Sequence, residues 1–202
     1  SLEPENLIGA HGPPFSGQQE IKKIIINYRD TLQFLWDQTV RCANKGLTLN
    51  ETINVIKLPR QFSDHYTTQQ LYGLVEHHVR QIYTGLFGWF DEDEANLFPV
   101  PLPERSQRLV EGFGGKARVR EIIDASLTKN DFRWAIELSS WLVRGNFNDL
   151  GIADAGELED RNRLASALRG VAYTTSAANI RNWCITRSLE FDETLNLIRF
   201  RK

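Results

Sequence analysis

The sequence predicts an all-α fold. Apolar residues recur at three- and four-residue spacing over long stretches of its 202 residues, a pattern typical of helices that bury one face. Strand patterns are almost absent: Leu7 and Ile8, followed by glycines and prolines, resemble the exit of a buried strand. Because so short a strand needs neighbouring strands, we expect the chain to be a fragment of a longer protein.

Composition and charge argue against several function classes. The formal net charge is −2, from 24 basic and 26 acidic residues, so the chain lacks the electrostatic footprint of a protein that binds nucleic acid or an anionic membrane. No apolar run is long enough to span a membrane. Cys42 and Cys184 fit no metal-binding or redox spacing, and we expect both to be small packed residues.

The first helix is expected over residues 17–44. Its apolar face is formed by Ile21, Ile24, Ile25, Tyr28, Leu32, Leu35, Trp36, Thr39, Val40 and Ala43. A helix of this length would span roughly 40 Å at ~1.5 Å per residue, which is long for a compact monomer. We therefore expect it to lie across a large core or against a partner chain, since helices are stabilised mainly by burying an amphipathic face.

Two further helices are expected before residue 88. Thr48 and Glu51 have the spacing of a capping box, which starts a second helix that must end before Pro59. Residues 61–70 are polar and are predicted to form a surface loop. A third helix is predicted over 71–87, with one apolar face made of Leu71, Val75, Val79, Ile82 and Leu86.

A proline-rich segment divides the sequence. Residues 88–104 hold an acidic run and three prolines at alternate positions, which excludes a helix and favours an extended surface segment. Short helices follow, expected over 104–113, 117–128, 132–143, 157–173 and 177–198. The pair within 117–143 is similar to a tetratricopeptide unit, but the loop at 145–155 is too long for a regular array.

Six ordered blocks carry a specific resemblance. They read HGPPFSG, YRDTLQFLWDQTVRCANKGLT, VIKLP, YGLVEHHVRQIYTGLFGWFD, LFPVPLP and NDFRWAIELSSWLV. Together they resemble the middle portion of the alkyl sulfatases of the metallo-β-lactamase superfamily, over about residues 8 to 187. In that family an all-helical domain that pairs two subunits follows the zinc hydrolase domain.

The resemblance implies a domain plan and a function. Residues 1–16 would be the end of the hydrolase domain, 17–103 the helical dimerisation domain, and 104–202 a tetratricopeptide-like region leading to a missing C-terminal domain. The expected function is to pair and link the subunits of a zinc-dependent sulfatase that hydrolyses aliphatic sulfate esters. We expect a homodimer formed through the helices at 17–44 and 71–87, with Leu35 and Trp36 as interface anchors.

The resemblance also assigns residues. His11 would match the last metal-binding histidine of the hydrolase domain, so zinc is implied for the full-length parent. The family's His-x-His-x-Asp-His cluster is absent, and a hydrolytic zinc site needs three protein ligands, so neither zinc nor catalysis is expected from this chain alone. His77 and His78 point about 100° apart on a helix, and we expect one packed and one solvated side chain.

The block around residues 72–83 resembles the family most closely. Tyr72 and Arg80, on one helix face, are candidates for the substrate entrance, since a guanidinium fits a sulfate, and Tyr83 lies in the same block. The structural alternative is that Arg80 pairs with an acidic neighbour across a helix interface. A different reading of the whole chain is a tetratricopeptide-like adaptor that binds other proteins and has no link to catalysis.

Overall fold

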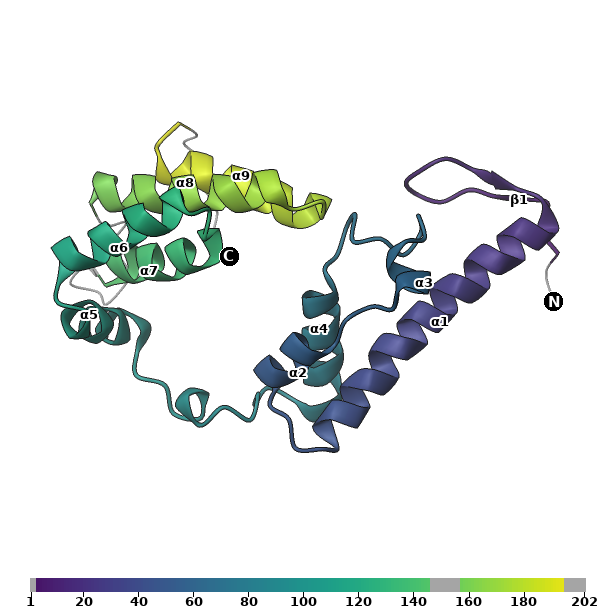
Figure 1. Ribbon diagram of the computed structural model, residues 1–202, viewed down its shortest axis with the longest axis horizontal. Helices are drawn as coiled ribbons and strands as arrows, with labels where there is room; N and C mark the ends of the chain where they lie inside the picture. The colour runs from purple at the N-terminus through teal and green to yellow at the C-terminus, as the bar shows by residue number, and fades with distance from the viewer. Residues whose placement is uncertain (1–2, 146–156, 195–202) are drawn as a thin grey trace, which may run out of the picture. The chain divides into compact units, whose positions relative to one another are not determined.

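The computed structural model describes residues 3–145 and 157–194, and it confirms the all-α prediction (Figure 1). The chain divides into two compact units, residues 1–97 and 98–202, each with a helical core of its own. The predicted domain boundary after residue 103 lies inside the helix that opens the second unit. Within the described ranges, no helix is both long and apolar enough to cross a membrane.

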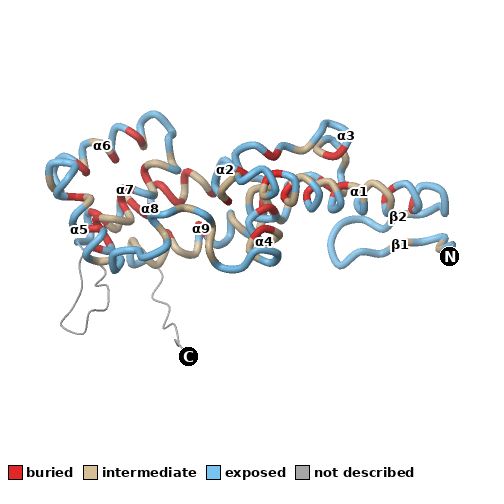
Figure 2. Tube along the Cα trace, turned by 90° about the horizontal axis from the view of Figure 1, so that it is seen from below, coloured by how far each residue is buried: buried red, intermediate tan, exposed pale blue. Residues whose placement is uncertain are grey.

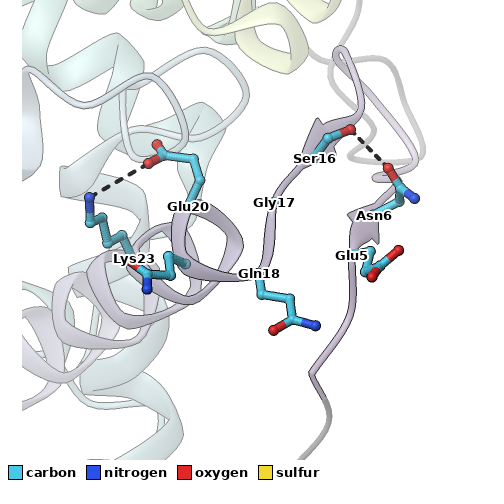
Figure 3. Close-up of a pocket in the computed structure, with 8 residues that line it drawn as sticks. Glu5, Asn6, Ser16, Gly17, Gln18, Glu20 and Lys23 are labelled. Atoms are coloured by element: carbon cyan, nitrogen blue, oxygen red, sulfur yellow. Dashed lines mark hydrogen bonds and ion pairs between the residues drawn. The ribbon is translucent and has the colours of Figure 1, made fainter.

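The first unit opens with a small hairpin. Strand β1 (Asn6–Leu7) pairs antiparallel with β2 (Phe15–Ser16), and the Ser16 hydroxyl donates to Asn6 Oδ1 at 2.8 Å (Figure 3). The prediction of a buried strand is wrong: Ile8 is 80% exposed. The reason is that β1 pairs only with β2, and no further strand flanks this two-stranded sheet within the described part of the chain.

Helix α1 (Gln18–Ala43) forms close to its predicted bounds. Its buried residues lie on one face and are Ile21, Ile24, Thr31, Leu35, Thr39 and Cys42. In Figure 2 these buried positions recur along α1 between exposed turns. Gly46 follows the helix with φ 77°, the left-handed conformation that glycine adopts without strain.

Helix α2 (Leu49–Val55) confirms the predicted capping box. The Glu51 amide donates to Thr48 Oγ1 at 3.2 Å, and the Thr48 amide donates to Glu51 Oε2 at 2.8 Å. Hydrogen bonding from the backbone and then from the side chain of Thr48 favours the ionised carboxylate and lowers the pKa of Glu51.

The loop predicted at 61–70 is partly wrong. Helix α3 (Arg60–Ser63) begins there, and Phe62 and Thr68 are both buried. The Thr68 hydroxyl donates to the Phe62 carbonyl at 2.5 Å, so a polar side chain closes the segment onto itself. Polarity at 61–70 therefore reflects internal hydrogen bonding as well as exposure.

Helix α4 (Val75–Phe87) begins four residues later than predicted. The Gln70 side chain accepts a hydrogen bond from the Val75 amide at 2.8 Å, which satisfies a helix N-terminal donor from outside the helix. The segment 71–74 is therefore not helical. Val79 and Tyr83 are the buried residues of α4, and Val79 joins Leu35, Cys42 and Ile56 in the core of the first unit.

The proline-rich segment is non-helical as predicted over residues 88–101, apart from the 3-10 turn η1 (Glu94–Asn96). The prediction is wrong at residues 102–104, which form the first turn of a helix, because proline is tolerated in the first helical turn. The second unit comprises α5 (Leu102–Gly112), α6 (Lys116–Thr128), α7 (Phe132–Arg144), α8 (Leu158–Thr174) and α9 (Ala178–Phe191). Helix α7 contacts α5, α6 and α8, and α8 contacts α9. The helix predicted to reach residue 198 ends at Phe191, and residues 195–198 lie outside the described residues.

Both cysteines are buried and free, as predicted. Cys42 lies in the core of the first unit, and Cys184 packs with Val143, Leu164 and Leu168 in the second. The tetratricopeptide likeness stays a prediction, because residues 146–156, between α7 and α8, lie outside the described ranges.

An ion network joins α6 to α8. Asp160 on α8 is fully buried and accepts two hydrogen bonds from Arg120 on α6, at 2.7 and 2.8 Å. Glu157 accepts from Arg120 at 2.6 Å and from Lys116 at 2.9 Å. These contacts cross between helices that are far apart in the sequence, so they fix α6 against α8.

The ion network between α6 and α8 predicts that the stability of the fold falls at acidic pH. Hydrogen bonds from Lys116 and then Arg120 lower the pKa of Glu157 from its ordinary value of 4.5. A carboxyl whose folded pKa lies below its unfolded pKa stabilises the fold above the unfolded value and loses this contribution as pH falls through the folded value. We expect thermal stability to decline below about pH 4.5. Glu157→Gln should flatten part of that decline, and an unchanged pH profile in the variant would contradict the assignment.

Candidate functional site

The hairpin brings two predicted site residues together. The His11 ring lies against the Tyr72 ring, with centroids 5.0 Å apart and an interplanar angle of 35°. Beside this contact, Phe15 packs edge-on against Tyr66 with centroids 6.4 Å apart. His11 and Tyr72 are both exposed, so the pair forms a surface site on the first unit.

Tyr72 borders a small cavity of about 220 Å³. Gly73 and His78 also line it, together with Tyr28 and Leu32 of α1. A Cβ atom on Gly73 would lie 2.6 Å from Nε2 of His78, so the His78 ring lies directly over Gly73 and a larger residue there would displace it. Since His77 and His78 are both exposed, the expectation of one packed and one solvated histidine is wrong.

The structure places Arg80 and Tyr83 differently from the prediction. Tyr72 precedes α4, so the premise that Tyr72 and Arg80 share one helix face is wrong. Arg80 is exposed, and within the described residues its guanidinium makes no ion pair. Tyr83 is buried, and its pKa is raised by burial and then by the charges of Glu92 and Asp91, so it is a core residue.

A zinc site is not formed by the described residues alone. Among them, no group of three His, Cys, Asp or Glu side chains lies close enough to hold a metal ion. Because a hydrolytic zinc ion needs three protein ligands, His11 could supply only one of them.

A line of exposed apolar residues runs along α1. These residues, the α1 stripe, are Ile25, Tyr28, Leu32 and Trp36. They lie beside the buried face of the helix, and Trp36 is 46% exposed. The prediction of Leu35 as an interface anchor is wrong, because Leu35 is only 3% exposed and packs in the core against α4. Sequence periodicity shows ten apolar positions but does not separate the buried from the exposed ones.

Comparison with known proteins places the chain in a family. The family described as alkyl sulfatase dimerisation matches residues 48–193, a range that includes parts of both units. A linear primary-alkylsulfatase of Pseudomonas sp. (strain ATCC 19151) is 33% identical over 197 residues, which are 96% of this chain and 36% of that protein. The alkyl/aryl-sulfatase BDS1 of Saccharomyces cerevisiae is 30% identical over 184 residues, 91% of this chain and 27% of that protein.

Solved structures of alkylsulfatases are also similar to this chain. The stereoselective inverting sec-alkylsulfatase Pisa1 from Pseudomonas sp. superposes with a TM-score of 0.85 at 30% identity, over 98% of this chain and 30% of that chain. The chain thus spans roughly a third of the length of the relatives it matches and corresponds to their dimerisation region. On these matches, the chain belongs to the alkyl sulfatase dimerisation family.

Proposed function

We propose that this chain pairs two copies of a zinc-dependent alkyl sulfatase, and that the α1 stripe lies in the contact between them. The observation that carries the proposal is the stripe itself, four large apolar side chains in line on a long helix. Contiguous exposed apolar patches mark interaction sites in soluble proteins. A two-fold pair would cover the same patch on both copies at once.

The free energy of burying the stripe is large enough to offset the cost of association. Fully burying one such side chain contributes about 1.5–3 kcal/mol, and the stripe residues are already about half covered in the single chain. Four of them on each of two copies therefore supply several kcal/mol, which is comparable with the cost of association. The dimerisation family match covers residues 48–193, so it supports the pairing of two copies, and the stripe is assigned to the contact on its exposure alone.

Light scattering tests this proposal. At micromolar concentration we expect a mass twice that of the 23.2 kDa chain. The mass should fall toward that of one chain on dilution, as a reversible pair requires. A single-chain mass at all accessible concentrations would contradict the proposed function.

For the whole protein we propose hydrolysis of aliphatic sulfate esters, with His11 as one zinc ligand. Support comes from the alkylsulfatase relatives and from the HGPP block that carries His11. The remaining ligands would have to come from other residues, since the described part of the chain offers no ligand group. Residues 1–16 would then belong to the hydrolase domain.

Metal analysis of the isolated chain is a direct check. We expect no stoichiometric zinc after dialysis against micromolar zinc, because one histidine cannot form a tight site. Elemental analysis gives the metal content, with His11→Ala as the matched control. One equivalent of zinc in the parent chain that is lost in His11→Ala would show a site in this chain.

Tyr72 and Arg80 are proposed to border the substrate entrance of the whole enzyme. The contact of Tyr72 with His11 supports this, since it places Tyr72 beside the proposed zinc ligand. In the whole enzyme, Arg80→Ala is expected to lower kcat/KM for alkyl sulfates by about tenfold or more while zinc content and dimer mass stay constant. Gln81→Ala, also exposed on α4, is the control. Unchanged turnover, or loss of the dimer, would make Arg80 a structural residue.

A further inference from the structure

The cavity that Tyr72 borders, the Tyr72 cavity, reaches from the surface of the first unit into its core. Among the residues that line it, Leu35 is buried, and Leu58 and Val75 are half-buried. Tyr28 and Tyr72 also line it and are exposed. The site is therefore concave, with an aliphatic interior and an aromatic mouth, which is the usual form of a small-molecule site.

The polar side chains that line the Tyr72 cavity are largely used inside the chain. The hydroxyls of Thr31 and Thr68 donate to backbone carbonyls, at 2.8 and 2.5 Å. The Thr67 hydroxyl is hydrogen-bonded to a histidine ring at 2.9 Å, and the Gln70 side chain accepts from the Val75 amide. A polar ligand would lose its hydration and find few uncommitted hydroxyls in exchange, which costs free energy. The cavity therefore favours an apolar ligand.

The Tyr72 cavity lies next to the proposed zinc ligand. Tyr72 lines the cavity and also holds its ring against His11, with centroids 5.0 Å apart. One residue thus connects the cavity with the ring that is proposed to hold zinc. The cavity volume is about 220 Å³. Dry apolar cavities of about 150 Å³ accept benzene, so this cavity has room for roughly eight carbon atoms.

We propose that the Tyr72 cavity binds the alkyl chain of the sulfate ester and sets the chain length that the whole enzyme prefers. This rests on the proposed function, because it assumes hydrolysis of aliphatic sulfate esters beside His11. Each methylene that leaves water for an apolar cavity gains about fourfold in binding. Pairing through the α1 stripe would cover the cavity mouth at Tyr28 and Leu32, so the alkyl chain enters past Tyr72.

The chain-length preference of the whole enzyme is the first test. The measured quantity is kcat/KM for octyl sulfate divided by kcat/KM for butyl sulfate, a ratio from which the concentration of active enzyme cancels. Four methylenes at about fourfold each give a ratio on the order of 100 or more in the parent enzyme. Val75→Phe fills the cavity and should lower this ratio by about tenfold or more. Val75→Ala enlarges the cavity and should raise kcat/KM for decyl sulfate relative to octyl sulfate.

Ile82→Val is the matched control for the enzyme assay. Ile82 also lies on α4 and packs against the core of the first unit, but it is not among the residues that line the cavity, so the ratio should not change. Unchanged ratios in both Val75 variants, with octyl sulfate still hydrolysed, overturn the alkyl site and leave the proposed function intact. An enzyme that hydrolyses none of these esters overturns both. A control that shifts the ratio as far as Val75→Phe also overturns the alkyl site, because the effect then comes from general loosening of α4.

Binding to the chain itself is a second test, which needs neither zinc nor turnover. Octan-1-ol carries the alkyl chain without the sulfate, and we expect one equivalent to bind and to shift the methyl NMR signals of Leu35, Leu58 and Val75. Val75→Phe should raise the Kd for octan-1-ol by about tenfold or more, whereas Ile82→Val should leave it unchanged. Shifts centred on Ile25, which belongs to the α1 stripe and does not line the cavity, would overturn the alkyl site. The absence of saturable binding would overturn it as well.

Discussion

Asp160→Ala is expected to lower the free energy of unfolding by about 3 kcal/mol. The Asp160 carboxylate is fully buried and takes two hydrogen bonds from Arg120, at 2.7 and 2.8 Å. Removing it leaves a largely covered guanidinium without its main partner, a change that costs roughly 3–5 kcal/mol in buried pairs. Glu157 still pairs with Arg120 at 2.6 Å, so we place the effect at the lower end of that range.

Denaturant unfolding of the full chain gives the measurement. The control is Glu121→Ala, which removes an exposed pair with Arg118 whose atoms lie 2.8 Å apart. Exposed pairs of this kind contribute about 0–1 kcal/mol, so the control should be nearly neutral. Equal effects of the two substitutions would mean that the buried pair does not hold α6 against α8.

Local signals account for the parts of the fold that the sequence predicts well. The capping box of Thr48 and Glu51 is formed by residues three apart, so the sequence alone specifies it. The start of α4 is different. It depends on the Gln70 side chain reaching the Val75 amide and on the His78 ring lying over Gly73, and helical periodicity contains neither contact.

Long-range contacts account for the features that the sequence does not predict. Arg120 and Asp160 lie 40 residues apart, and each alone resembles a residue on a solvated charged face. The same holds for the candidate site: the His11–Tyr72 contact depends on the hairpin folding over the segment before α4, which no spacing in the sequence indicates. The placement of Tyr72 outside α4 then follows from the late helix start.

Adjacent positions on α1 show why packing has to be known before an interface is assigned. Leu35 and Trp36 are neighbours in one apolar pattern, yet α4 covers Leu35 and leaves Trp36 partly in water. Leu35→Ala should therefore act on folding, with a loss of about 2–5 kcal/mol in the free energy of unfolding. This loss should be independent of protein concentration if Leu35 serves only the core of one chain.

Trp36→Ala should instead weaken association by about 2–4 kcal/mol, the scale of a central interface anchor, while the unfolding of the single chain changes little. Such a loss raises the dimer Kd by roughly thirty-fold to several hundred-fold. Sedimentation across a dilution series measures it, and Trp183→Ala, an exposed tryptophan on α9, is the matched control. If Trp36→Ala leaves the Kd unchanged, the α1 stripe is not the contact. If Trp183→Ala is equally disruptive, the contact lies on the second unit.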